Sequence, residues 1–177
     1  ANTFLYARGS PMGKSLYEQD FKETINEIHE LAKKYNCKIF LPVDIVVSKD
    51  FVKNADYKIV NINECPSDHM ILDIGEKSIE LFKRIISSSK TILWNGPLGA
   101  FETKPFDKGT NALAKYTSYI TKNNQCISVA GGGDTIAALN SINVTEDFTY
   151  VSSAGGAFLE WLEGKELPGI KAINLIK

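Results

Sequence analysis

Apolar residues follow two spacings along this chain, and each spacing predicts a different kind of element. From Lys14 to Tyr35 they recur every three or four residues, which is typical of an amphipathic helix. Helices are also predicted over 76–88, 107–121, from Asp134 through Leu139, and over 157–163. Short, mostly apolar runs predict strands, and these are 38–42, 44–48, 57–60, 70–75, 91–94, 126–130 and 148–151.

The order of these elements predicts the fold class. Strands and helices alternate, and the strands are short and largely apolar on both faces, which is typical of a parallel sheet covered by helices on both sides. We therefore expect an α/β fold: a doubly wound, mostly parallel sheet with helices on both faces, Rossmann-like and three-layered. The more polar stretch 49–70 is expected to be an excursion from the sheet.

The first five residues, Ala1-Asn2-Thr3-Phe4-Leu5, resemble the end of a strand and lack an initial Met. We interpret the chain as part of a longer protein. Its 177 residues are enough for one compact domain with a core of useful size.

Composition and charge exclude several classes of function. The net charge is −1, from 20 basic and 21 acidic residues, which argues against broad binding of nucleic acid or of anionic membranes. No apolar run is long enough to span a membrane, and no signal peptide is visible. The three cysteines are widely spaced and form no C-x-x-C pair, so neither a zinc site nor a disulfide framework is expected. A cytoplasmic location and a monomer are the simplest expectations.

Glycine-rich turns follow three of the predicted strands. They are Asn95-Gly96-Pro97, Gly131 to Asp134, and Ser152 to Gly156. In open α/β sheets, ligands bind beyond the carboxyl ends of the strands. Glycines let main-chain N–H groups approach phosphate oxygens, and helix N-termini add partial positive charge. These turns therefore predict a phosphate site, although neither a complete P-loop nor a G-x-G-x-x-G fingerprint is present.

Two interpretations are possible for each of three side chains. Asp134 is placed to hold Mg²⁺ together with phosphate oxygens, or it is only a helix N-cap. Glu102 could accept hydrogen bonds from sugar hydroxyls, or it is solvated surface. Leu72 could form an apolar wall for a purine ring, or it belongs to an ordinary core. Position alone leaves these alternatives open.

Five motifs occur in an order that carries a more specific resemblance. They are Leu41-Pro42-Val43-Asp44, Leu72-Asp73-Ile74-Gly75, Trp94-Asn95-Gly96-Pro97, Gly131-Gly132-Gly133-Asp134-Thr135 and Leu162-Glu163-Gly164-Lys165-Glu166-Leu167-Pro168-Gly169. Together they resemble the C-terminal, nucleotide-binding domain of phosphoglycerate kinase, from Ala1 nearly to Lys177. The resemblance implies reversible phosphoryl transfer between 1,3-bisphosphoglycerate and ADP, which gives 3-phosphoglycerate and ATP.

The resemblance also implies roles for individual residues. By this likeness Asp134 helps to hold Mg²⁺ on the ADP or ATP phosphates, and Glu102 takes the ribose hydroxyls. The other nucleotide contacts that it implies are Leu72 near the adenine, Asn95 and Pro97 beside the nucleotide, and Gly132, Gly133 and Thr135 along the phosphate path. Gly155 and Gly156 open the helix that points at the transferring phosphoryl group. Ser153 and Ala154 stand where the family commonly has Thr and Gly, and Ala154 would be strained if that position needs a positive φ.

The resemblance further implies that residues 1–177 are a partial C-terminal domain, and that the N-terminal domain that binds phosphoglycerate is absent. Phosphoryl transfer needs positioning and charge stabilisation from both halves, so negligible turnover is expected from this chain alone. Two other hypotheses remain at this point. One is a stand-alone nucleotide-binding or regulatory module without catalysis, and the other is a purely structural α/β interaction domain.

Overall fold

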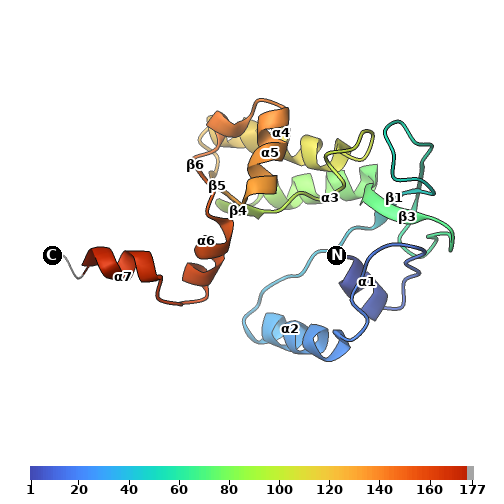
Figure 1. Cartoon of the computed structure of the whole chain (residues 1–177), viewed down its shortest axis with the longest axis horizontal. Coiled ribbons are helices and arrows are strands. Elements are labelled where there is room, and N and C mark those ends of the chain that lie inside the picture. The colour runs from blue at the N-terminus through green and yellow to red at the C-terminus, as the bar shows by residue number, and fades with distance from the viewer. Residues whose placement is uncertain (175–177) are drawn as a thin grey trace. The chain divides into compact units, whose positions relative to one another are not determined.

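The computed structural model describes residues 1–174, which form two compact units (Figure 1). The first unit comprises Ala1–Arg84 and Leu98–Ala112, and the second comprises Ile85–Pro97 and the residues from Leu113 onwards. Each unit has its own three-stranded sheet.

The first unit is built around an antiparallel sheet in the order β2-β1-β3. Its core contains Ile45, Val47 and Cys65, with Val60, Ile62 and Ile71 packed against them. Its elements are α1 (Asn2–Ala7), α2 (Lys22–Lys34), β1 (Asp44–Ser48), β2 (Lys58–Asn61), β3 (Met70–Ile74), and the N-terminal parts of α3 (Glu76–Ser87) and α4 (Lys108–Lys122).

The second unit holds a parallel sheet in the order β4-β5-β6. Trp94, Ala130, Leu139 and Phe148 are buried in it, and the Trp94 and Phe148 rings meet edge to face with centroids 6.3 Å apart. Its complete elements are β4 (Thr91–Asn95), β5 (Ile127–Gly131), α5 (Gly133–Ser141), the 3₁₀ turn η1 (Thr145–Asp147), β6 (Tyr150–Ser152), α6 (Gly155–Leu162) and α7 (Pro168–Asn174).

The α/β class is confirmed, and the parallel Rossmann-like sheet with its helices is found in the second unit. The antiparallel pairing of β1 with β2 and with β3 is a feature that the apolar runs did not predict. Parallel neighbours need a crossover connection, which is usually a helix. The chain between Ser48 and Met70 contains only β2, so β1 and β3 have no helical crossover between them.

Three local predictions in the N-terminal part were wrong. The helix predicted from Lys14 begins only at Lys22, because the Lys14 N–H donates to the His69 carbonyl oxygen and the Ser15 hydroxyl accepts the Ile71 N–H. These tertiary contacts hold residues 14 and 15 against the start of β3. Residues 38–42 form no strand, and the opening residues form α1 rather than a strand end.

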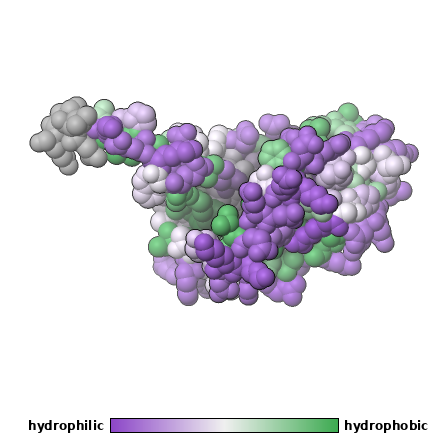
Figure 2. Space-filling model, turned by 90° about the horizontal axis from the view of Figure 1, so that it is seen from below, coloured by the Kyte–Doolittle hydropathy of each residue, from purple (hydrophilic) through white to green (hydrophobic). Residues whose placement is uncertain are grey.

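Apolar side chains are exposed in small groups on a mostly hydrophilic surface, as the face in Figure 2 shows. On α2 they include Ile28 and Leu31, and on α6 they include Trp161. Within residues 1–174, no helix is both long enough and apolar enough to cross a membrane.

Candidate functional site

The carboxyl ends of β4, β5 and β6 lie side by side at one edge of the parallel sheet. Asn95 pairs with Gly131, and Gly131 pairs with Ser152, so the last residues of the three strands are in register. The three glycine-rich turns that follow these strands therefore converge at this edge (Figure 1).

Hydrogen bonds connect the turns to one another. The Gly132 N–H donates to the Ser152 carbonyl oxygen over 3.1 Å, and the Gly96 N–H donates to the buried Thr135 hydroxyl over 2.7 Å. Gly132 has φ 99° and Gly96 has φ 91°, a backbone region that residues with a Cβ rarely adopt. One backbone hydrogen bond and one hydrogen bond to a side chain thus connect the turns, and Thr135 has a structural contact in addition to its predicted place on the phosphate path.

Gly155 and Gly132 approach so closely that a side chain on Gly155 would clash with the Gly132 main chain. A Cβ added to Gly155 would lie 2.7 Å from Gly132 Cα and 2.8 Å from the Gly132 nitrogen. The same Cβ would lie 3.4 Å from Asn95 Oδ1, and a Cβ on Gly132 would lie 3.3 Å from that oxygen. The Asn95 side chain therefore reaches both glycine turns, which places Asn95, Gly132 and Gly155 together.

Asp134 lies in the first turn of α5, and its side chain is exposed. Gly132 is the N-cap of this helix, so the reading of Asp134 as only the N-cap is wrong. Within residues 1–174 no side-chain hydrogen bond or ion pair involves the Asp134 carboxylate. Both of its oxygens are therefore free to bind a cation beside main-chain N–H groups.

The Asp134 carboxylate is an oxygen ligand of the type that Mg²⁺ binds. No group of three or more His, Cys, Asp or Glu side chains in the described part of the chain could hold a metal ion. Mg²⁺ commonly takes one or two carboxylates and fills its remaining positions with phosphate oxygens and water. Asp134 supplies one exposed carboxylate at the edge where the glycine-rich turns lie.

Helix α6 begins at the same edge, and its first two residues are Gly155 and Gly156. Ala154 is its N-cap and has φ −90°, so the strain considered for this residue does not arise. The Ala154 N–H donates to the Ser152 hydroxyl over 3.2 Å, which shapes the turn before the helix. The N-termini of α5 and α6 both present N–H groups and partial positive charge at this edge.

Leu72 and Glu102 belong to the first unit. Leu72 is half-buried on β3 and lines a pocket of about 160 Å³ with Ile71, Leu98 and Ala100 among its neighbours. Glu102 is exposed in the turn before α4. Contact of these residues with adenine and ribose stays a prediction, as do the roles of Pro97, Gly133 and Gly156.

The carboxylates of Asp44 and Asp73 are buried, and the sequence predicted no role for either of them. Asp44 Oδ1 accepts the Ser78 N–H over 2.7 Å, and its Oδ2 accepts the Lys77 N–H over 3.0 Å, so Asp44 caps the first turn of α3. Asp73 accepts the Gly109 N–H over 2.8 Å in the first turn of α4. Each carboxylate caps a helix more than 30 residues away, and no local pattern reveals such a pair.

Burial raises the pKa of Asp73 to about 6. The N–H groups of Gly109 and Ile74 act against this rise, while the charge of Asp107 raises the pKa and the charge of Lys108 lowers it. Its ordinary value is 3.8. The folded state therefore holds the proton more tightly than the unfolded state between these values.

We expect the Asp73 carboxyl to titrate near pH 6 in the folded chain. The free energy of unfolding should then fall as the pH rises from about 4 to about 6, by at most about 3 kcal/mol, and this contribution should be constant above that range. Carboxyl-carbon NMR checks the midpoint, and chemical denaturation at several pH values checks the slope. A midpoint at or below pH 4 would contradict the prediction.

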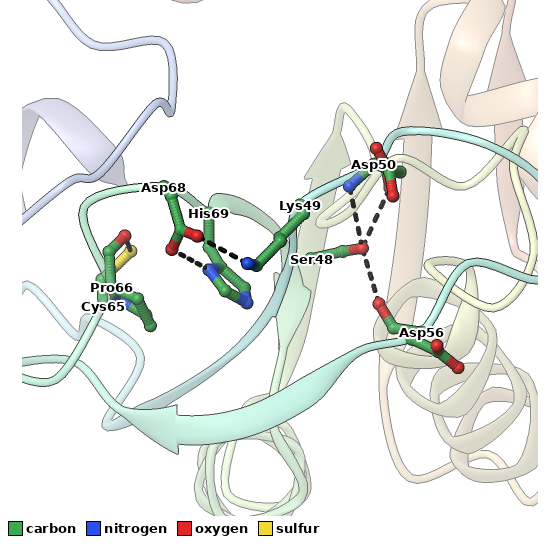
Figure 3. Close-up of polar contacts among 8 residues, drawn as sticks. All are labelled: Ser48, Lys49, Asp50, Asp56, Cys65, Pro66, Asp68 and His69. Carbon is green, nitrogen blue, oxygen red and sulfur yellow. Dashed lines mark hydrogen bonds and ion pairs between the residues drawn. The ribbon is translucent and has the colours of Figure 1, made fainter.

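A second polar cluster lies in the first unit (Figure 3). His69 is 6% exposed, and its Nδ1 lies 2.6 Å from Asp68 Oδ1, while Lys49 Nζ lies 2.7 Å from Asp68 Oδ2. Lys49 first, and then His69, hold the pKa of Asp68 well below its usual range. The Ser48 hydroxyl lies 2.7 Å from the Asp56 carbonyl oxygen and fixes the neighbouring turn. These contacts attach the segment before β3 to the end of β1.

The family model and the related sequences that match this chain all belong to one family. The family model for phosphoglycerate kinase matches residues 1–165. Phosphoglycerate kinase of Zymomonas mobilis is 54% identical over 174 residues, which cover 98% of this chain and 44% of that protein. The Agrobacterium fabrum enzyme is 54% identical over 177 residues, which cover 100% of this chain and 44% of that protein.

Solved structures agree with the sequence matches. The phosphoglycerate kinase from Coxiella burnetii superimposes with a TM-score of 0.88 at 41% identity, over 96% of this chain and 43% of that one. The Pyrococcus horikoshii enzyme gives 0.75 at 27% identity, over 98% of this chain and 42% of that one. The chain thus spans less than half the length of these relatives, and it belongs to the phosphoglycerate kinase family.

Proposed function

We propose that this chain supplies the nucleotide-binding part of a phosphoglycerate kinase of glycolysis. The complete reaction transfers a phosphoryl group reversibly between 1,3-bisphosphoglycerate and ADP, which gives 3-phosphoglycerate and ATP. The observation that carries the proposal is the edge of the parallel sheet where three glycine-rich turns converge beside the exposed Asp134 carboxylate. Such an edge suits the phosphate groups of a nucleotide.

The chemistry of this edge is positioning and charge stabilisation. Main-chain N–H groups at the starts of α5 and α6 would bind phosphate oxygens, and Asn95 would add an amide between the turns. Bound Mg²⁺ would neutralise part of the negative charge on the phosphates, and Asp134 would orient it. Gly155 and Gly156 would direct the N-terminus of α6 at the phosphoryl group in transfer.

Further parts of the proposal rest on the family. Residues 1–177 would be part of the C-terminal domain, and the phosphoglycerate would bind to an N-terminal domain that has no counterpart in this chain. Turnover by the chain alone would then be negligible, since donors from both halves stabilise the transferring group. A cytoplasmic monomer that binds neither nucleic acid nor membranes fits the near-neutral charge.

Isothermal titration calorimetry tests the proposal. We expect the chain to bind ADP in the presence of Mg²⁺, and Asp134→Ala to raise the Kd roughly tenfold, which corresponds to about 1.4 kcal/mol. With EDTA in place of Mg²⁺, the variant and the original chain should bind ADP equally, because Asp134 acts through the cation.

Glu146→Ala is the matched control, because Glu146 is also an exposed carboxylate near a helix start in the second unit. It should leave the Kd for Mg-ADP unchanged. Equal Mg-ADP binding by Asp134→Ala would remove the metal role. Absence of any ADP-induced rise in Tm would favour a purely structural domain, since a ligand of the folded state must stabilise it.

A further inference from the structure

The segment Leu98–Glu102 is tied by its backbone to two other elements of the first unit. The Ala100 N–H donates to the Leu72 carbonyl oxygen on β3 over 2.8 Å. The N–H groups of Leu98 and Gly99 both donate to the Thr110 hydroxyl on α4, over 3.0 and 3.4 Å. The position of this segment therefore depends on how β3 and the start of α4 are joined.

The Asp73 side chain connects β3 to the start of α4. It is on β3 and is 2% exposed, and its Oδ2 accepts the N–H of Gly109, the residue before Thr110. A Cβ on Gly99 would lie 2.5 Å from Asp73 Oδ1, and a Cβ on Gly109 would lie 2.4 Å from the same oxygen. The carboxylate thus fills the space where β3, the segment and α4 meet.

Glu102 ends this segment, and no hydrogen bond or ion pair of its side chain is found within residues 1–174. Its place is set by the backbone: the Thr103 N–H donates to the Ala100 carbonyl oxygen over 2.9 Å, and the Phe106 N–H donates to the Thr103 carbonyl oxygen over 2.9 Å. Phe106 itself is completely buried. The segment therefore presents an unpaired carboxylate from a fixed turn.

We infer that Asp73 is a positioning residue for Glu102, and that it sets the discrimination of this chain for nucleoside diphosphates that carry ribose hydroxyls. The inference rests on the proposed function and on the hydrogen bonds from those hydroxyls that the family resemblance implies for Glu102. Hydrogen bonds from a hydroxyl to a carboxylate are short and weaken steeply when their angle changes. A shift of the segment that leaves the chain folded is therefore enough to lose them.

The test compares the Kd for ADP with the Kd for 2′,3′-dideoxy-ADP, measured by calorimetry on the 177-residue chain. We expect the original chain to prefer ADP by roughly tenfold or more, the ratio typical of hydrogen bonds to a charged group. Asp73→Asn keeps the size of the side chain but leaves one acceptor oxygen for two N–H donors, those of Gly109 and Ile74. Its preference should fall to within about threefold of unity.

Asp44→Asn is the matched control, because Asp44 is also a buried carboxylate that caps a helix of the first unit, and its side chain bonds to Lys77 and Ser78 rather than to Gly109. It should lower Tm and keep the preference for ADP. A loss of stability alone cannot then explain the result for Asp73→Asn, since a merely structural role predicts the same preference in both variants.

Gly99→Ala provides a second variant that leaves the Asp73 carboxylate in place. Its Cβ would meet Asp73 Oδ1 at 2.5 Å and the Phe106 carbonyl oxygen at 2.6 Å, so the segment must move. It should also lose the preference for ADP, and Glu102→Gln in either background should then cause little further change.

The outcomes separate the inference from the function on which it rests. A full preference for ADP in Asp73→Asn, or in Gly99→Ala, overturns the positioning role while nucleotide binding stands. Binding of ADP without any preference in the original chain overturns the role of Glu102, and the inference with it. Failure to bind either nucleotide overturns the proposed function itself.

Discussion

Replacing Asp44 by alanine should lower the free energy of unfolding by about 3 kcal/mol, because two helix-terminal N–H groups lose their acceptor in a buried place. The Ser78 and Lys77 N–H groups both donate to this carboxylate, and the Ser78 hydroxyl lies 2.6 Å from its Oδ1. The capping residue of α3 lies on strand β1 rather than in the turn that precedes the helix. Its loss should therefore loosen both α3 and its attachment to β1.

Thermal denaturation followed by circular dichroism measures this effect. A loss of about 3 kcal/mol corresponds to a Tm lower by roughly 6–12 °C for a chain of this size. Asp20→Ala removes the same carboxylate at an exposed position and should change Tm by little more than 1 °C. Equal Tm values for the two variants would show that the cap contributes no net stability.

Gly155→Ala should disrupt the proposed phosphate-binding edge and lower stability by about 3 kcal/mol, at the upper end of the usual cost of overpacking. The new Cβ would meet the Gly132 main chain at 2.7–2.8 Å, and main-chain atoms cannot rotate away as a side chain can. The start of α6 must therefore move from the end of β5. The Kd for Mg-ADP should rise at least tenfold as the two turns separate.

Gly156→Ala is the stability control from the same helical turn, since a Cβ there meets no atom within 4 Å. It should raise stability by up to about 1 kcal/mol, because alanine loses less backbone freedom than glycine in a helix. The two adjacent substitutions thus have opposite expected signs, which chemical denaturation resolves. A stabilising Gly155→Ala would disprove the close approach.

Part of the fold follows from spacing alone, and part of it does not. The periodicity over 76–88 and 107–121 predicts α3 and α4 to within one residue at each end, because an amphipathic helix records its buried face in its own sequence. The stretch from Lys14 has the same periodicity, yet residues 14–21 are not in the helix. Hydrogen bonds to His69 and Ile71 override the local preference there.

The candidate site divides in the same way. Glycine turns after apolar strands predict a phosphate-binding edge, because the requirement for close main-chain approach is local. The partners of Asp44 and Asp73 could not be predicted, since each helix cap joins residues more than 30 positions apart. The sequence also left open whether Asp134 is an N-cap, because helix boundaries are uncertain by a few residues, and the helix start at Gly133 decided it.

Residue order along the chain was sufficient for helices α3 and α4 and for the glycine turns, because each depends on neighbours within a few residues. The α/β class and the family resemblance followed from the order of such local features along the chain. Three-dimensional contacts decided the antiparallel sheet of the first unit, the late start of α2, the contact of Gly155 with Gly132 and the burial of Asp73. These features depend on pairing and desolvation between distant segments. Such interactions leave no periodic signal in either partner alone.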